Sequence, residues 1–290
     1  MINLNIKKAK PQSLVQRMFI NALPQRKPDA HKGSFGSVAV IGGAASMSGA
    51  VLLSARAALL TGTGRTYASM LSAYAPNIDF LHPEIMFRPP ADLAKLEQLD
   101  CLVIGPGLGQ ADGALELLEF WLNQNKKLLI DADALNLIAK HADLAKICKK
   151  RKADTVITPH VGEAARLLKA SSEDVQLNRI DSAIQLADEL KVTCVLKGAG
   201  TVITHYDGSC FVNTTGNVGL ASGGTGDVLS GVIASLMGQG MVGMEAAKLG
   251  VFVHGAAADA LVARDIGPIG LTASEVTIEV RNIINQLSRK

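Results

Sequence analysis

Short apolar runs alternate with longer runs of helical character from residue 37 to the C-terminus. Short apolar runs bounded by Gly, Pro or polar residues are typical of buried strands, and longer runs with helical periodicity are typical of helices. We predict strands at residues 38–41, 65–69, 84–87, 102–104, 127–130, 155–157 and 192–196, and a hairpin formed by 201–204 and 209–212. We predict helices at about 48–60, 113–123, 181–190, 227–237, 244–263 and 273–287, and one more after residue 160.

The order of these elements indicates the fold class. Strands that alternate with helices predict an α/β protein with a mostly parallel central sheet and helices on both faces. The chain has no internal repeat and no low-complexity linker, so we expect a single domain over residues 1–290. Residues 1–32, with prolines at 11, 24 and 28, are expected to form an N-terminal arm of one helix and a loop. Thr272 and Glu275 form a capping box that predicts the start of the last helix.

Composition agrees with this fold and excludes several classes of function. Apolar residues make up 48% of the chain and aromatic residues only 4%, which suits small-residue helices packed on a sheet. The net charge of +3 is too small for a nucleic-acid surface, and the basic run at 149–152 is expected to end a helix. The longest uncharged segment, 228–244, is short for a membrane span and contains Gly238 and Gly240, so we expect no membrane partner.

The cysteines and the N-terminus indicate the compartment. The four cysteines lack the spacing of metal ligands, and Cys101 and Cys194 lie beside apolar runs, so we expect both in the core. The first residues contain no apolar segment of the kind that directs secretion. A reducing cytoplasm is the simplest location that fits these observations.

Small and polar residues follow several of the predicted strands. In open α/β sheets, ligands bind at the carboxyl ends of the strands, so these segments should lie along one rim. Each segment alone could be an ordinary turn, but together they favour a ligand site. The segments are 42–43, 105–109, 131–133, 158–160 and 197–201.

The most informative motif is Gly-Gly-Thr-Gly-Asp at residues 223–227, which runs directly into a predicted helix. Its glycines allow backbone N–H groups to converge, and the helix adds unpaired N–H groups and the positive end of its dipole. This combination suits a phosphate. Asp227 could be an ordinary residue of the helix start, or it could accept a proton from a hydroxyl held beside the phosphate.

Two other nucleotide motifs are weak or absent. Gly105 and Gly107, followed about 20 residues later by Asp131, are similar to a dinucleotide-binding fingerprint. That fingerprint needs a third glycine where this chain has Gln110, and Pro106 removes a backbone donor. The chain also lacks a Walker A motif, which excludes P-loop chemistry.

Several polar residues have both a structural and a functional interpretation. His160 follows a predicted strand and could be either a hydrogen-bonding residue or part of the site. His254 lies in an apolar helix, where a buried core histidine is the better interpretation. Asp131 and Asp133 could hold a metal, although Asp133 resembles a helix cap. Lys197 could bind a phosphate or only end a strand.

Taken in order, the motifs resemble those of the NAD(P)H-hydrate dehydratase family, which belongs to the ribokinase-like superfamily. The resemblance covers about residues 24–290 and implies a three-layer α/β/α ribokinase-like fold. The motifs that carry it are HKGSFG at 31–36, VIGG at 40–43, Ser48-Gly49-Ala50, IGPGLG at 104–109, DADALN at 131–136, TPHVGE at 158–163, LKGAGTVI at 196–203, NTTGN at 213–217 and ASGGTGD at 221–227.

This resemblance implies roles for particular residues. Ala50, Gly107 and His160 would line the hydrated nicotinamide nucleotide, and Asp227 would meet it at the reacting carbon. Many relatives have an aromatic residue where this chain has Ser46-Met47-Ser48. The adenine nucleotide would be held by Lys197, Gly198, Ala199, Gly200, Thr201 and Gly226.

The same resemblance implies an ADP-dependent enzyme that dehydrates the S form of hydrated NADH or NADPH and releases AMP and phosphate. We hypothesise that Asp227 takes the proton of the substrate hydroxyl while that oxygen attacks the terminal phosphoryl group of ADP. Mg²⁺ would bridge the phosphates, with ligands that no motif fixes. A homotetramer and a separate epimerase chain, too large for the N-terminal arm, are also expected.

Two rival functions share these sequence features. A small-molecule kinase of the same superfamily, acting on a vitamin-precursor alcohol, would keep the glycine motif and the sheet but leave a stable phosphorylated product. A nucleotide-binding regulatory protein would keep the fold without chemistry, and the intact Asp227 argues against it.

Overall fold

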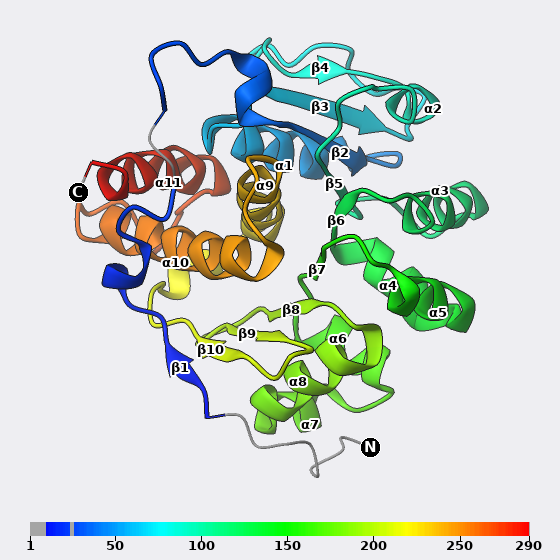
Figure 1. The fold of residues 1–290 in the computed structure, drawn as a ribbon. Helices are drawn as coiled ribbons and strands as arrows, with labels where there is room; N and C mark the ends of the chain where they lie inside the picture. The colour runs from blue at the N-terminus through cyan, green and yellow to red at the C-terminus, as the bar shows by residue number, and fades with distance from the viewer. Residues whose placement is uncertain (1–9, 24–25, 290) are drawn as a thin grey trace.

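The strands of the protein form one sheet with helices on both faces (Figure 1). The computed structural model describes residues 10–23 and 26–289. Across the sheet the strands lie in the order β1-β10-β9-β8-β7-β6-β5-β2-β3-β4. Their bounds are β1 Gln12–Ser13, β2 Ser37–Gly42, β3 Arg65–Met70, β4 Met86–Phe87, β5 Cys101–Ile104, β6 Lys127–Ile130, β7 Thr155–Ile157, β8 Thr193–Leu196, β9 Val202–His205 and β10 Cys210–Val212.

Most neighbouring strands run parallel, as predicted. β2 pairs in parallel with β3 and β5, and the parallel series continues through β6, β7 and β8. Among the strands of the described residues, only β9 runs against its neighbours, because β9 and β10 form the predicted hairpin. Since parallel strands present their carboxyl ends at the same edge, the loops after β2, β5, β6, β7 and β8 lie along one rim.

The helices form the two outer layers of the fold. Their bounds are α1 Ser48–Leu60, α2 Pro90–Leu93, α3 Asp112–Leu122, α4 Ala132–Lys140, α5 Ala142–Lys150, α6 Val161–Leu168, α7 Ser172–Leu177, α8 Arg179–Leu190, α9 Thr225–Gly238, α10 Gly243–Val262 and α11 Ala273–Leu287. Helices α1, α9, α10 and α11 lie on one side of the sheet, and α3, α4 and α5 lie on the other (Figure 1).

Alternate side chains of the central strands enter two separate cores. In β2, Val38 and Val40 pack with the layer that contains α1 and α9, and Ala39 and Ile41 pack with the opposite layer. A parallel sheet buried on both faces needs nearly continuous apolar strands, which explains the unbroken apolar runs of the sequence. The three-layer α/β/α fold is thereby confirmed.

Close packing of α9 against α1 fixes the helix that carries the glycine motif. A Cβ atom added to Gly231 of α9 would lie 2.0 Å from the Ser54 carbonyl oxygen of α1 and 2.9 Å from the Ala57 side chain. Only a glycine permits this approach of the two backbones. The first turn of α9 is therefore held firmly beside the ends of the parallel strands.

The N-terminal arm differs from the expected helix and loop. Its described part contains the short strand β1, which pairs with β10, and a 3-10 turn at Gln16–Phe19, and a second 3-10 turn, Lys32–Phe35, begins at its last residue. Leu14 and Phe19 are buried, and the ring of Phe19 lies 4.9 Å from that of Phe252. Residues 1–9 and Pro24, which the expectation also covered, lie outside the described residues.

Other differences from the sequence predictions are local. The helices α2 and α7 were not predicted, and the cap of α4 is Asp131 rather than Asp133. The basic residues Lys149 and Lys150 do end a helix, α5, as predicted. All four cysteines are buried and unpaired. Among the described residues, no helix combines the length and the apolar character that crossing a bilayer requires.

Candidate active site

The loops singled out in the sequence meet at the carboxyl ends of the strands. The loop after β2 is joined to the loop after β5, because Gly43 N donates to Pro106 O at 3.0 Å and Ala44 N donates to Gly107 O at 2.7 Å. Lys197, after β8, donates its backbone N–H to Pro159 O after β7 at 2.8 Å. The predicted rim is confirmed by these contacts.

A cavity of about 540 Å³ opens beside the first turn of α9. Its size falls within the range of small-molecule sites. All six residues expected to hold the adenine nucleotide line it: Lys197, Gly198, Ala199, Gly200, Thr201 and Gly226. The opposite wall comes from the loop at residues 213–218 and from His254 and Gly255 of α10.

The turn before α9 has the conformation that its glycines suggest. Gly224 has φ +87, and a Cβ atom there would lie 2.4 Å from Leu53 Cδ1. Thr225 Oγ1 donates to Leu220 O at 2.8 Å and to Ser222 O at 3.0 Å, which ties the turn to the preceding loop. The first amide groups of a helix have no intrahelical partner, so this end of α9 presents donors to an anion in the cavity.

Asp227 lies in this first turn and is half-buried. Its pKa is raised to about 7, chiefly by burial and also by the charges of Asp131 and Glu163, against the opposing effect of Lys197. A carboxyl group with a pKa near 7 is suited to accept and release a proton. Its position beside an anion site therefore fits a general base.

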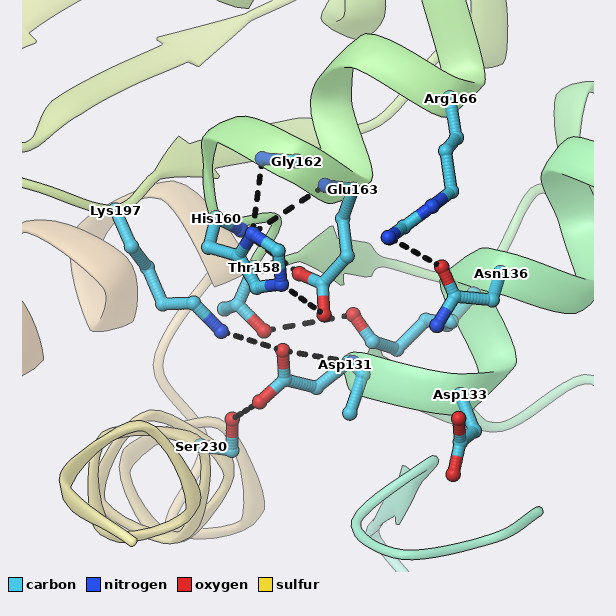
Figure 2. A network of polar contacts seen from close by, with 12 residues as sticks. Asp131, Asp133, Asn136, Thr158, His160, Gly162, Glu163, Arg166, Lys197 and Ser230 are labelled. Atoms are coloured by element: carbon cyan, nitrogen blue, oxygen red, sulfur yellow. Dashed lines mark hydrogen bonds and ion pairs between the residues drawn. The ribbon is translucent and has the colours of Figure 1, made fainter. Parts of the chain in front are cut away.

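Lys197 and Asp131 form a partly buried ion pair next to this turn (Figure 2). Lys197 Nζ donates to Asp131 Oδ1 at 2.7 Å, and Ser230 Oγ of α9 donates to Asp131 Oδ2 at 2.6 Å. Lys197 Nζ lies 3.5 Å from the position that a Cβ atom of Gly226 would take. Burial would lower the pKa of Lys197, but the carboxylates around it outweigh this effect and raise it, so the ammonium group stays charged.

His160 caps helix α6, so it has the hydrogen-bonding role that the sequence analysis left open. Its Nδ1 accepts hydrogen bonds from Gly162 N at 2.9 Å and Glu163 N at 3.3 Å, and Glu163 Oε2 accepts from His160 N at 2.8 Å (Figure 2). His160 Nε2 lies 3.2 Å from Glu163 Oε1. The ring is therefore fixed, and since both nitrogens have partners it contributes a surface rather than a free base. Its side chain is 54% exposed and remains available for contact with a ligand.

Ala50, in the first turn of α1, lies beside Gly107, in the loop after β5, and both are outside the cavity lining. Gly107 has φ +57, and its added Cβ atom would lie 3.5 Å from Ala50 Cβ and 2.6 Å from Met47 Cβ. Met47, which lies in the segment where many relatives have an aromatic residue, is therefore next to Gly107. Its side chain is 49% exposed. Together these residues form a second part of the rim, separate from the cavity.

Some residues of the site have a role that sequence reasoning did not assign. Asp131 was considered for a metal, but it binds Lys197 and Ser230. Glu163 is buried, and burial raises its pKa to about 7. The motifs DADALN and TPHVGE contain both acids, so the signal was present, but partners distant in sequence could not be inferred.

His254 is buried as predicted, yet it also lines the cavity. Burial lowers its pKa to about 4, so the ring is neutral, and its Nε2 has no partner within the described structure. A buried nitrogen without a partner is a natural contact for a ligand.

The described residues contain no cluster of three or more His, Cys, Asp or Glu side chains that could hold a metal. Asp133 accepts a hydrogen bond from Gly109 N at 2.9 Å, which leaves it a structural role in the glycine loop. Mg²⁺ is commonly held by one or two carboxylates together with phosphate oxygens and water.

Comparison with known proteins identifies the family. The family model described as NAD(P)H-hydrate dehydratase matches residues 38–279. The ADP-dependent (S)-NAD(P)H-hydrate dehydratase of Neisseria meningitidis is 38% identical over 277 residues, which cover 93% of this chain and 92% of that protein. The bifunctional NAD(P)H-hydrate repair enzyme of Escherichia coli is 39% identical over 91% of this chain. The chain spans about half the length of such bifunctional relatives.

Solved structures agree with this result. The crystal structure of the ADP/ATP-dependent NAD(P)H-hydrate dehydratase of Bacillus subtilis, co-crystallised with ATP and Mg²⁺, is similar with a TM-score of 0.85 and 28% identity. That similarity covers 99% of this chain and 100% of the other. The chain belongs to the NAD(P)H-hydrate dehydratase family.

Proposed function

We propose that the protein dehydrates the S form of hydrated NADH or NADPH at the expense of ADP, restoring NAD(P)H and releasing AMP and phosphate. The observation that carries this proposal is the position of Asp227. It lies in the first turn of α9, adjacent to Gly226 of the cavity wall and within the electrostatic reach of Lys197. An acid of raised pKa beside a phosphate site is what activation of a substrate hydroxyl requires.

Asp227 performs the proton transfer in this mechanism. Its carboxylate takes the proton of the ring hydroxyl while the hydroxyl oxygen forms a bond to the terminal phosphorus of ADP and AMP departs. The carbon–oxygen bond then breaks as the ring nitrogen supplies its electron pair, and phosphate leaves. Loss of a proton from the neighbouring carbon restores the double bond.

The chain supplies a suitable environment for the adenine nucleotide. Lys197 provides a fixed positive charge, and the amino end of α9 provides backbone donors. Gly198, Ala199, Gly200 and Thr201 would hold the nucleotide along the cavity wall, with Gly226 beside the phosphates. Mg²⁺ supplies charge neutralisation of the phosphates when it is bound with the nucleotide.

The nicotinamide part of the substrate would lie against Ala50, Gly107 and His160. Ala50 and Gly107 are small residues in close contact, and the exposed side chain of Met47 borders them at this part of the rim. His160 offers the face of a fixed, half-exposed ring. These features support a flat, nucleotide-like ligand that reaches from this rim to Asp227.

Two partners belong to the proposal. An epimerase that converts the other form of the hydrated cofactor into the S form is the expected functional partner, and relatives named bifunctional repair enzymes support a second activity of this pathway. A homotetramer is the expected assembly. Large apolar side chains on the surface, among them Tyr74, Phe80 and Leu81, support burial of this surface between subunits.

Recovery of NADH tests the proposed function directly. The purified protein is incubated with hydrated NADH and Mg²⁺, with ADP, with ATP or with neither, and the absorbance of NADH is followed. We expect recovery with ADP and none without a nucleotide. Failure of both nucleotides to restore NADH would exclude a dehydratase, and a stable phosphorylated alcohol from another substrate would favour a kinase instead.

A further inference from the structure

Asp131 connects three parts of the chain that are distant in sequence. Its side chain is almost fully buried, with 2% of its surface exposed. Oδ1 accepts from Lys197 Nζ at 2.7 Å and from Ala132 N at 2.9 Å, and Oδ2 accepts from Ser230 Oγ at 2.6 Å (Figure 2). The carboxylate thus joins the end of β6, the loop after β8 and the second turn of α9.

Carboxylates other than Asp131 also attract the ammonium group of Lys197. Asp227 and Glu163 both act on it electrostatically, from α9 and α6. A lysine side chain is long and flexible, so without a fixed partner it would move among these acids. The two hydrogen bonds that Asp131 receives from Ala132 and Ser230 keep its own carboxylate in place. Lys197 Nζ is held in consequence near Gly226, at the amino end of α9.

We propose that Asp131 is a positioning residue that holds the Lys197 ammonium group at the amino end of α9, where it faces the phosphoryl group being transferred. This inference rests on the proposed function, because the phosphoryl group defines what Lys197 faces. Asp131 itself need not touch either substrate. Its second effect is to keep Lys197 from pairing with Asp227, which must remain free to take a proton.

Asp131→Asn tests this role, because the amide has the shape of the carboxylate but not its charge. We expect kcat to fall by up to about 100-fold, as small misplacements of catalytic groups do, while KM for ADP changes much less. The acid limb of the pH–kcat profile should move to lower pH. The loss of the Asp131 charge and the release of Lys197 both lower the pKa of Asp227. The Asp131 charge also raises the pKa of Glu163 and His160, so their pKa values fall in this variant as well.

A double-mutant cycle shows whether Asp131 acts through Lys197. Lys197→Met removes the ammonium group, and in this background Asp131→Asn should cause no further loss of kcat. An equal loss in both backgrounds would overturn the proposal, because it would mean that Asp131 acts independently of Lys197. Asp143→Asn is the matched control: it breaks an exposed pair with Lys146 of 2.9 Å on α5, remote from the site.

Ser230→Ala keeps the ion pair but removes the hydroxyl that steadies it. We expect kcat to fall several-fold. Wild-type turnover of this variant would contradict the proposal even if Asp131→Asn failed to fold. An inactive wild type would instead refute the proposed function. Active wild type together with active Asp131→Asn, and an unmoved acid limb, would refute only the positioning role.

Discussion

Asp227 is a half-buried acid among other charges, and these charges determine when it is ionised. Because the carboxylate must accept a proton in the proposed reaction, replacing it with a group that is not a base should lower kcat. Asp227→Asn preserves the shape of the side chain, and we expect kcat to fall by about 10²–10⁴-fold with the Kd for ADP nearly unchanged. Turnover is measured with hydrated NADH, and calorimetry gives the Kd. Turnover equal to that of wild type would remove Asp227 from the mechanism.

The pH dependence of the reaction follows from the same group. Burial raises the pKa of Asp227 to about 7, and an acid is protonated below its pKa. A protonated carboxyl group cannot take the hydroxyl proton, so kcat/KM should fall about tenfold per pH unit below pH about 7. Initial rates across this range test it, with the thermal midpoint recorded at each pH to exclude unfolding. A rate that stays constant down to pH 5 would contradict this assignment.

The sequence was sufficient to identify residues of the ligand-binding loops but not the side-chain contacts between residues distant in sequence. The turn at residues 223–227 and the loop at 197–201 could be identified because their composition and their position after a strand or before a helix are both visible. The bonds from Asp131 to Lys197 and Ser230 could not, since the partners lie 66 and 99 residues away. His160 remained ambiguous until the backbone of α6 was seen to donate to its ring.

At the scale of elements, the contact between α1 and α9 sets the position of the anion site. Gly231→Ala adds a methyl group that would lie 2.0 Å from the Ser54 carbonyl oxygen. We expect the free energy of unfolding to fall by about 1–3 kcal/mol, as overpacking commonly costs. The measurement is chemical denaturation monitored by circular dichroism.

Gly113→Ala is the matched control for this substitution. Gly113 lies in helix α3, and an added Cβ atom meets nothing within 4 Å. Alanine is the better helix former, so we expect the free energy of unfolding to rise by about 0.5–1 kcal/mol. Equal effects of the two substitutions would contradict the close helix contact.

Elements with a strong apolar pattern were predicted closely, and short ones were not. The bounds predicted for α1, β6, β7 and α11 are those observed, since each has a clear apolar run and a clear boundary signal. Strand β1 has only two residues, both exposed, and exists because β10 offers it an edge. Such pairing is a tertiary effect that no local pattern encodes.

At the scale of the whole molecule, the loop between β3 and β4 exposes large apolar side chains. Tyr74 is 96% exposed, Phe80 88% and Leu81 72%. We expect the wild type to have four times the chain mass of 30.4 kDa in light scattering. Phe80→Asp should reduce this mass, because burying a charge between subunits is unfavourable. A wild type of the mass of a single chain would contradict the tetramer.

The layered fold itself could be predicted from the alternation of elements, because a parallel sheet buried on both faces leaves an unmistakable series of apolar strands. The cavity could not, since it forms only when the loop at 213–218 and α10 meet the loop after β8. Its wall combines segments that the sequence shows separately.

The balance of products shows whether phosphoryl transfer to the substrate hydroxyl drives the loss of water. Wild-type protein is incubated with hydrated NADH, ADP and Mg²⁺, and NADH, AMP and free phosphate are measured in the same samples. We predict that the three appear in equal amounts throughout the reaction. Formation of AMP with a stable phosphorylated compound and no NADH, or recovery of NADH without AMP, would contradict it.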